Sequence, residues 1–278
     1  MGMYGFIKKF FGLLCLLALS KFCTMRFVLG RLLEETKVMA MNEQEEAKAF
    51  IEQLQKEGVL TEETRLIWEM ILPERLKRMY DVLQKRTRYI TVLTEAVDDP
   101  HNQAAVLRTA EAFGVQDVYV VTGKAPFQPN PLVTRHANKW LTLQQKPDIV
   151  TTIKGLQAKG YQVYASYLGE GTLRLGDIDV SRPTALLFGN EHSGVSQEAI
   201  HAADATFMIP MYGFVQSFNI SVAAALALYD VTERARQQAG ERYYLSFQEK
   251  KELFEKWMWQ TLNPRIRERL AKQMGRSV

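Results

Sequence analysis

The sequence predicts an α/β protein with a mainly parallel sheet, extended at both ends by helical segments. Between residues 89 and 240, short segments rich in Val, Ile, Leu and Tyr alternate with longer segments of helical periodicity, which is the pattern of parallel strands joined by crossover helices. The segments before and after this region have helical patterns only. The chain has 278 residues, 47% of them hydrophobic and 24% charged, so it can bury a sizeable core.

Most elements are bounded by a residue that starts or ends them. Gly58 ends the first helix, Pro73 begins a fresh helix inside the second helical stretch, and the turn at Pro100 can cap the helix that ends at Gly114. Residues of high β-propensity mark the strands. The expected helices cover residues 42–58, 61–88, 103–113, 148–159, 198–203 and 218–238, with one or two more after Glu241. The expected strands cover residues 90–97, 118–121, 161–167, 184–188 and 206–209.

The first 40 residues differ from the rest. Lys8 and Lys9 precede an apolar run over residues 10–19, which is the outline of a secretory signal peptide and is too short for a comfortable transmembrane helix. A downstream start of translation, for example at Met41, is the interpretation we favour, because the sequence turns polar and helical there. The expected division is an N-terminal extension over 1–40, a helical region over 41–88, an α/β domain over 89–240 and a helical aromatic and basic extension over 241–278.

Cysteine and histidine are too scarce for a disulfide framework or a metal cluster. The chain has two cysteines, both within the first 40 residues, and four histidines spread from His101 to His201, so no metal site is expected. The sequence also lacks the patterns GxGxxG, GxxxxGK[ST] and GxSxG. Their absence argues against a dinucleotide-binding fold, a P-loop and a serine hydrolase.

Two basic segments flank a nearly neutral centre. Residues 74–88 and 241–278 each carry a net charge of +4, whereas residues 89–240 carry −3. Basic arms on a neutral body fit a polyanionic partner, above all a nucleic acid. On charge alone, ordinary solvated helix faces are the simpler interpretation. The side chains expected to contact a nucleic acid are Arg75, Lys77, Arg78, Lys85, Arg86 and Arg88.

Three loops at the ends of expected strands contain unusual residues, and such loops are where parallel sheets bind ligands. In the first, Arg108 lies in an apolar stretch of helix, so its half-buried guanidinium is expected to need an anionic partner. In the second, glycines on both sides of Glu191 let the backbone approach a ligand closely. In the third, Ser217 and Asn219 lead into a helix N-terminus with unpaired N–H donors. A structural salt bridge would explain the first feature taken alone, and a tight turn the second.

Together the three loops resemble the motifs of the SpoU/TrmH branch of the SPOUT RNA 2′-O-methyltransferases. The elements are N-x-x-x-x-x-R-T-A from Asn102, F-G-N-E-x-x-G from Phe188 and I-P-M-x-G-x-x-x-S-x-N from Ile209, and they are specific as a set. The resemblance covers about residues 74–240, and the basic arms resemble the RNA-binding extensions of the tRNA guanosine enzymes in this branch. It implies S-adenosylmethionine as cofactor and 2′-O-methylation of a guanosine in the D-loop region of tRNA. The alternatives are the same reaction on rRNA and a catalytically silent RNA-binding protein.

The resemblance also implies a trefoil knot at the carboxyl end of the sheet, a homodimer with sites near the subunit interface, and a cytoplasmic location without a stable membrane partner. It makes Arg108 the catalytic arginine, which can stabilise the forming alkoxide or orient a phosphate that accepts the proton. Asn102 would order the loop and the RNA contact, and Glu191 would hold the loops or orient Arg108. Ser217 and Asn219 would complete the pocket. The backbone of Ser166, Gly189, Ile209 and Phe218 would bind the cofactor.

Three further features of the sequence lead to separate predictions about RNA binding, core packing and the dimer interface. Asp98 and Asp99 precede the first motif, where relatives usually have a basic or neutral pair, and two acids there would repel phosphate unless they face away. Trp140 is expected to pack in the core rather than stack on RNA. The helix over 218–238 is apolar on more than one face, so it is expected to join the dimer interface. The tail residues expected to join it there are Phe254, Trp257 and Met258.

Overall fold

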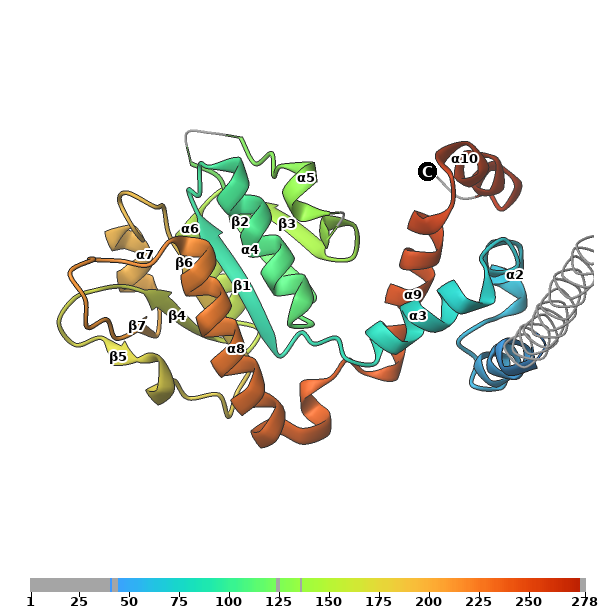
Figure 1. Cartoon of the computed structure of the whole chain (residues 1–278), viewed down its shortest axis with the longest axis horizontal. Helices are drawn as coiled ribbons and strands as arrows, with labels where there is room; N and C mark the ends of the chain where they lie inside the picture. Colours follow the sequence, from blue (N-terminus) through green and yellow to red (C-terminus); the bar gives the residue numbers. More distant parts are fainter. Residues whose placement is uncertain (1–40, 42–44, 124–125, 136, 276–278) are drawn as a thin grey trace, which may run out of the picture. The chain divides into compact units, whose positions relative to one another are not determined.

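The computed structural model describes residues 41, 45–123, 126–135 and 137–275 (Figure 1). The prediction for residues 1–40 lies outside the described residues. The chain divides into two compact units between Lys77 and Arg78, inside a helix, whereas the sequence analysis places the boundary after residue 88. None of the described helices is long and apolar enough to cross a membrane.

The first unit is helical. Residues 45–56 form a helix, and the following stretch is divided into the 3-10 helix η1 (Glu62–Thr64), the short helix α2 (Arg65–Trp68) and the first part of α3 (Pro73–Leu83). A new helix does begin at Pro73, as predicted, but the stretch expected to be helical to residue 88 ends at Leu83. The buried apolar residues of this unit include Leu54, Leu60 and Ile67.

The second unit contains a seven-stranded sheet in which all neighbouring strands are parallel, so the predicted α/β class is confirmed. The strand order is β3-β2-β1-β6-β4-β7-β5, which requires crossover connections between neighbours. The trefoil knot remains a prediction. The strands are β1 (Ile90–Glu95), β2 (Asp117–Val121), β3 (Thr142–Lys146), β4 (Gln162–Ser166), β5 (Leu173–Arg174), β6 (Thr184–Phe188) and β7 (Ala205–Met208).

The two strands at the edges of the sheet are missing from the sequence analysis. β3 reads Thr-Leu-Gln-Gln-Lys and is only half-buried, so it lacks the apolar run typical of a central parallel strand. β5 has two residues, too few to form a pattern. In contrast, every residue of β1, β2 and β6 is buried, and the sequence predicts all three.

Helices cover both faces of the sheet (Figure 1). The helices α4 (Pro100–Ala112) and α8 (Ile220–Ala239) lie side by side on one face and share an apolar cluster with β1, β2 and β6. The other face is covered by α6 (Ile149–Gln157) and α7 (Gln197–Ala202), which form a second cluster. All four helices are predicted by the sequence within a few residues. The short elements are α5 (Pro131–Thr134), η2 (Ala137–Lys139) and η3 (Leu175–Asp177).

The C-terminal extension folds back onto the second unit. It consists of the 3-10 helix η4 (Gly240–Tyr243), α9 (Phe247–Thr261) and α10 (Pro264–Gln273). The tail residues that the sequence analysis assigns to a dimer interface are buried within the single chain, so that assignment is wrong. These residues are Phe254, Trp257 and Met258, each at most 1% exposed.

Trp257 lies at the centre of this contact. Its Nε1 donates a hydrogen bond of 3.2 Å to the carbonyl oxygen of Trp140, and the two rings meet edge to face with centroids 5.4 Å apart. The guanidinium of Arg86 lies over the Trp257 ring, 5.3 Å from its centroid. Trp140 therefore packs against the protein, as predicted, rather than offering its ring to RNA.

Arg86 is fully buried, which corrects its assignment as an RNA contact. Its Nη2 forms an ion pair of 2.7 Å with Glu111, and its Nη1 donates to the carbonyl oxygens of Glu111, in the last turn of α4, and of Val115, just after that helix. Burial lowers the pKa of Arg86 from its ordinary value, although Glu111 opposes this shift. A guanidinium with 0% exposure has no surface to offer a phosphate.

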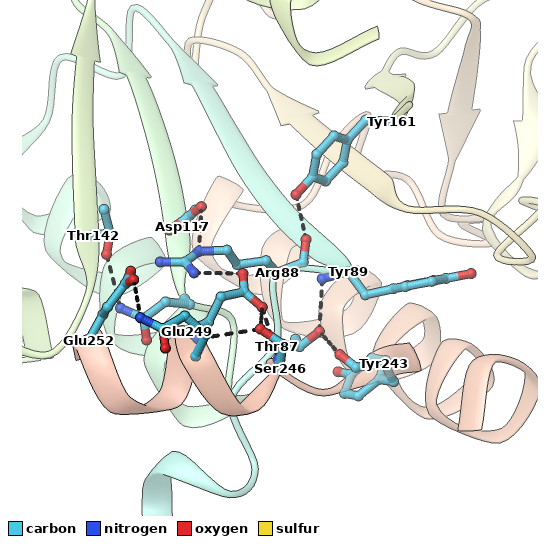
Figure 2. Close-up of polar contacts among 12 residues, drawn as sticks. Thr87, Arg88, Tyr89, Asp117, Thr142, Tyr161, Tyr243, Ser246, Glu249 and Glu252 are labelled. Atoms are coloured by element: carbon cyan, nitrogen blue, oxygen red, sulfur yellow. Dashed lines mark hydrogen bonds and ion pairs between the residues drawn. The ribbon is translucent and has the colours of Figure 1, made fainter. Parts of the chain in front are cut away.

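Arg88 fixes the start of α9 beside the sheet, as Figure 2 shows. Its Nε donates to Asp117 over 3.1 Å and its Nη1 donates to Glu249 over 2.8 Å. Glu249 also forms a capping box with Ser246 at the start of α9. Thr87 Oγ1 donates to a backbone carbonyl of η4. Because two carboxylates occupy the Arg88 guanidinium, we also withdraw Arg88 from the RNA contacts.

Candidate functional site

A pocket of about 380 Å³ lies at the carboxyl ends of β4, β6 and β7, which is a volume typical of small-molecule sites. Parallel strands direct their carboxyl ends to one edge of the sheet, so loops that are distant in the chain meet here. Glu191 and Ser217 line the pocket, together with all four residues predicted to bind the cofactor. These four are Ser166 at the end of β4, Gly189 after β6, Ile209 after β7 and Phe218 before α8.

The wall of the pocket that follows β6 requires a glycine. A Cβ atom at Gly189 would lie 2.2 to 2.3 Å from backbone atoms of Gly194 and Val195. The backbones of Asn190 and Gly194 pair in both directions, with N···O distances of 3.0 and 2.9 Å. A side chain at position 189 would therefore force this tight loop open.

Side chains from all three motifs form one hydrogen-bond network. Asn102 Nδ2 donates to Glu191 Oε1 over 2.8 Å, and Asn219 Nδ2 donates to Asn102 Oδ1 over 3.1 Å. Asn219 also caps α8, because its Oδ1 accepts the backbone N–H of Ser221 over 2.8 Å. The network thus joins the start of α4, the loop after β6 and the start of α8.

Arg108 does not have the environment that the sequence analysis expects. Its side chain is exposed, and no acidic side chain among the described residues is found in an ion pair with it. Of the two roles expected for Glu191, its bond to Asn102 agrees with holding the loops together, and no bond from Glu191 to Arg108 is found among the described residues. The reason is the orientation of α4: Leu107 and Ala110 pack on the sheet, and a step of about 100° per residue turns Arg108 outward.

The loop between β7 and α8 exposes large apolar side chains. Tyr212 is 91% exposed, and Phe214 and Val215 are exposed beside it. Ser217 is also exposed and lines the pocket. Rings of this size in one segment rarely face water in a monomer. We therefore expect a substrate or a second subunit to cover this loop.

The two acids before the first motif have identifiable roles. Asp99 Oδ1 accepts the backbone N–H of His101 over 2.8 Å and so caps α4. Asp98 Oδ2 lies 3.4 Å from Asn190 Nδ2 in the loop after β6. An acid at position 99 is therefore explained by the helix that follows it.

Two residues that stabilise the loop after β6, Glu95 and Asn190, are not among those predicted from the sequence. Glu95 is 8% exposed, and its carboxylate accepts the backbone N–H and the hydroxyl of Ser196 over 2.9 and 2.7 Å. A charged residue at the end of an apolar strand is the signal that could identify Glu95. Asn190 lies inside a quoted motif, but the motif alone suggests no task for it. In the described part of the chain, no group of three or more His, Cys, Asp and Glu residues could hold a metal ion.

The fold and the site together define the class of this protein. An all-parallel sheet, a pocket over its carboxyl ends and three loops joined by polar side chains are the features expected of a SpoU-type methyltransferase. A family model described as the SpoU rRNA Methylase family matches residues 89–229, and the chain belongs to this family. The resemblance seen in the sequence is confirmed.

Relatives of known activity are similar over most of their own length. The chain is 38% identical over 168 residues to the tRNA (guanosine(18)-2′-O)-methyltransferase of Escherichia coli K12, covering 60% of this chain and 73% of that protein. It is 40% identical over 166 residues to the enzyme of the same name from Thermus thermophilus, covering 60% and 85%. A crystal structure of the A. aeolicus TrmH/SpoU tRNA modifying enzyme is similar with a TM-score of 0.63 and 33% identity, covering 68% of this chain and 98% of that chain.

Proposed function

We propose that the protein transfers a methyl group from S-adenosylmethionine to the ribose 2′-oxygen of a guanosine in tRNA, at position 18, which the names of its relatives give. The observation that carries this proposal is the network from Asn219 through Asn102 to Glu191 beside the pocket. Its two hydrogen bonds join residues that are far apart in the chain: Asn219 and Asn102 by 117 positions, and Asn102 and Glu191 by 89 positions. We place the reaction in the cytoplasm, without a membrane partner.

The pocket fits a nucleoside cofactor. Gly189 lets the loop after β6 close tightly on itself at the wall of the pocket, because a Cβ there would meet the backbone of Gly194 and Val195. Ile209 and Phe218 provide apolar wall, and the backbone after β4 and β6 provides N–H and C=O groups. When bound, the cofactor supplies a methyl group on a good leaving group. The barrier then lies in positioning the 2′-hydroxyl and removing its proton.

The residues of this chain would act on that hydroxyl group. Arg108 brings a guanidinium, a permanent positive charge with several N–H donors. It would stabilise the forming alkoxide, or orient a phosphate oxygen that takes the proton. Asn102 and Glu191 would fix the start of α4 relative to the pocket, and Ser217 would contact the substrate from the loop that precedes α8.

The active assembly is proposed to be a homodimer built on α8. An exposed apolar row formed by Val222, Leu226 and Tyr229 follows one face of this helix, and Phe218 continues it toward the pocket. Spacings of three and four residues keep these side chains on one face. Because α8 packs beside α4, a second copy on this row would lie close to Arg108 as well.

The tRNA is proposed to bind the helical arms. The buried Arg86 and the ion-paired Arg88 are replaced in this assignment by residues of α10, where basic side chains three and four positions apart share the exposed face. Phosphate contacts of this kind give affinity without reading sequence. The exposed basic side chains are Arg75, Lys77 and Arg78 on α3, Lys85 just after it, and Arg265, Arg269 and Lys272 on α10.

Mapping of 2′-O-methyl groups in tRNA and rRNA from cells with and without the gene tests the proposal. The expected result is the loss of one methyl group from a D-loop guanosine of tRNA, matched by methylation of purified tRNA in vitro. Loss of an rRNA methyl group instead would replace the tRNA assignment. RNA binding without any methyl transfer would favour the catalytically silent alternative.

A further inference from the structure

The loop after β6 is tied at both ends to the chain that leaves β1. At the far end, Ser196 donates two hydrogen bonds to the buried carboxylate of Glu95. At the near end, Asn190 Nδ2 donates to the carbonyl oxygen of Ala96 over 2.6 Å. Glu191, the loop's member of the site network, lies between these two ties.

Asn190 also shapes the loop itself. Its Oδ1 accepts the backbone N–H groups of His192 and Ser193 over 2.8 and 3.2 Å. One amide side chain therefore turns the backbone around Glu191 with its oxygen and ties that turn to β1 with its nitrogen. The two functions can be separated, because they use different atoms.

The other end of the Asn190 tie is a constrained backbone. Ala96 has φ +53°, a left-handed conformation that alanine rarely adopts. Its N–H donates to the carbonyl oxygen of Val121 over 2.8 Å, and its carbonyl accepts from Asn190. This turn leads directly to Asp99, the cap of α4, and then to Asn102 in the first turn of that helix. The conformation of Ala96 thus sets where Asn102 lies.

We infer that Asn190 is a positioning residue for the methyl transfer, which acts by holding Glu191 and Asn102 at hydrogen-bond distance. The inference rests on the proposed function for its kinetic consequence only. The tie from Asn190 to Ala96 connects the loop that carries Glu191 to the turn that carries Asn102. Without it, the loop that carries Glu191 is tied to β1 only at its far end, through Ser196 and Glu95.

The Asn190→Asp variant tests this inference, because it keeps the accepting oxygen and removes the donor to Ala96. Above neutral pH, the new carboxylate is repelled by the Ala96 carbonyl and by Asp98. We expect kcat to fall about tenfold or more, with the Kd for S-adenosylmethionine within threefold of the wild-type value.

Two further variants separate positioning from a general loss of structure. Asn190→Ala lacks both atoms, so it should lose at least as much kcat. Asn130→Asp is the matched control: its Oδ1 also accepts a backbone N–H two residues ahead, from Leu132, and Asn130 does not line the pocket. Wild-type kcat in Asn190→Asp, or a loss confined to the Kd for the cofactor, would each overturn the inference.

A crystal structure of Asn190→Asp at pH 8 gives a readout that is independent of activity. The expected change is a longer distance between Asn102 Nδ2 and Glu191 Oε1, and an unchanged distance of 2.8 Å would overturn the inference even if the protein methylates another RNA. If this variant does not fold, Asn190→Ser serves in its place. A serine hydroxyl can still accept the N–H of His192 but is too short to reach Ala96, so the same lengthening is expected.

Discussion

Two arginines, Arg86 and Arg108, show how differently the same side chain is used. Arg86 is 0% exposed and bonds to Glu111, to two carbonyl oxygens and to the face of Trp257. Arg108 is exposed, and no partner for it is found in the described part of the chain. The guanidinium with partners supports the fold, whereas the one without partners is available to a ligand.

Two regions of the molecule differ in the same way. Near Arg86, the tail and the sheet are joined by the ion pairs of Arg88 with Asp117 and Glu249 (Figure 2) and by the packed rings of Trp140 and Trp257. In the loop after β7, which contributes Met211 and Gln216 to the pocket, Tyr212 and Phe214 are exposed instead. We expect the exposed guanidinium of Arg108 and the exposed rings of the loop after β7 to be covered by RNA or by a second subunit.

The largest expected effect is on catalysis and comes from Arg108→Ala. We expect kcat to fall by at least about 10² to 10³-fold, the cost typical of losing one group that stabilises developing charge. The Kd for S-adenosylmethionine should stay within a few-fold, because Arg108 does not line the pocket. Methyl-transfer kinetics and calorimetry measure the two quantities. The control is Arg174→Ala, an exposed arginine on the edge strand β5, and equal losses in both variants would remove the distinction.

Arg86→Ala should instead lower stability. Removing one partner of a buried ion pair typically costs 3 to 5 kcal/mol, and we expect about 2 to 4 kcal/mol because Glu111 is 28% exposed and can regain water. Urea unfolding measures this change. Arg108→Ala, by comparison, should change the free energy of unfolding by less than about 0.5 kcal/mol. Equal free energies of unfolding in the two variants would show that the buried contacts of Arg86 do not stabilise the fold.

Leu226→Asp should separate the subunits, because it places a charge in the exposed row of α8. We expect the dimer dissociation constant to rise about 30-fold or more, as for a residue at the centre of an interface. Sedimentation equilibrium should then shift from about twice 31.9 kDa toward the single-chain mass. Leu66→Asp is the matched control, since Leu66 is 41% exposed and Leu226 is 40% exposed. A wild-type protein that is monomeric and fully active would contradict the shared site.

The α10 row should affect tRNA affinity without affecting the cofactor. Replacing Arg265, Arg269 and Lys272 by glutamine should weaken tRNA binding, and each lost phosphate contact should reduce the slope of log K against log salt by about 0.7 to 0.9. Filter binding at several salt concentrations gives both values. An unchanged slope would mean that α10 serves the fold alone, like Arg86.

The smallest expected effect is a pH dependence at the Arg88 cluster. Burial alone would raise the pKa of Glu249, but hydrogen bonds from Ser246 and Arg88 lower it below its ordinary value of 4.5. The stability that Glu249 contributes is therefore present above the unfolded pKa and is lost as pH falls through the lower, folded value. Asp117 acts in the opposite direction, because burial raises its pKa despite Arg88. Thermal melts from pH 6 to pH 3 should fall more steeply for the wild type than for Glu249→Gln.

The central strands and the helices that cover them can be predicted, because each has its characteristic pattern within its own short stretch of sequence. The buried strands β1, β2 and β6 are apolar runs, and α4 and α8 have helical periodicity with caps near their starts. The edge strands β3 and β5 escape prediction, since an edge strand is held by its neighbour and needs no apolar run of its own. The pocket follows from the topology, because parallel strands bring their following loops to one edge.

The α/β class, the family and the three motifs whose residues meet at the pocket can all be predicted from the sequence. Which charged residues stabilise the fold cannot, because this depends on contacts between distant parts of the chain. Nothing in the sequence distinguishes Arg86 and Arg88 from Arg108. The first two form ion pairs with carboxylates that lie 25 to 161 positions away in the chain. Such partners leave no local pattern, because the desolvation of a guanidinium depends on what the whole chain packs around it.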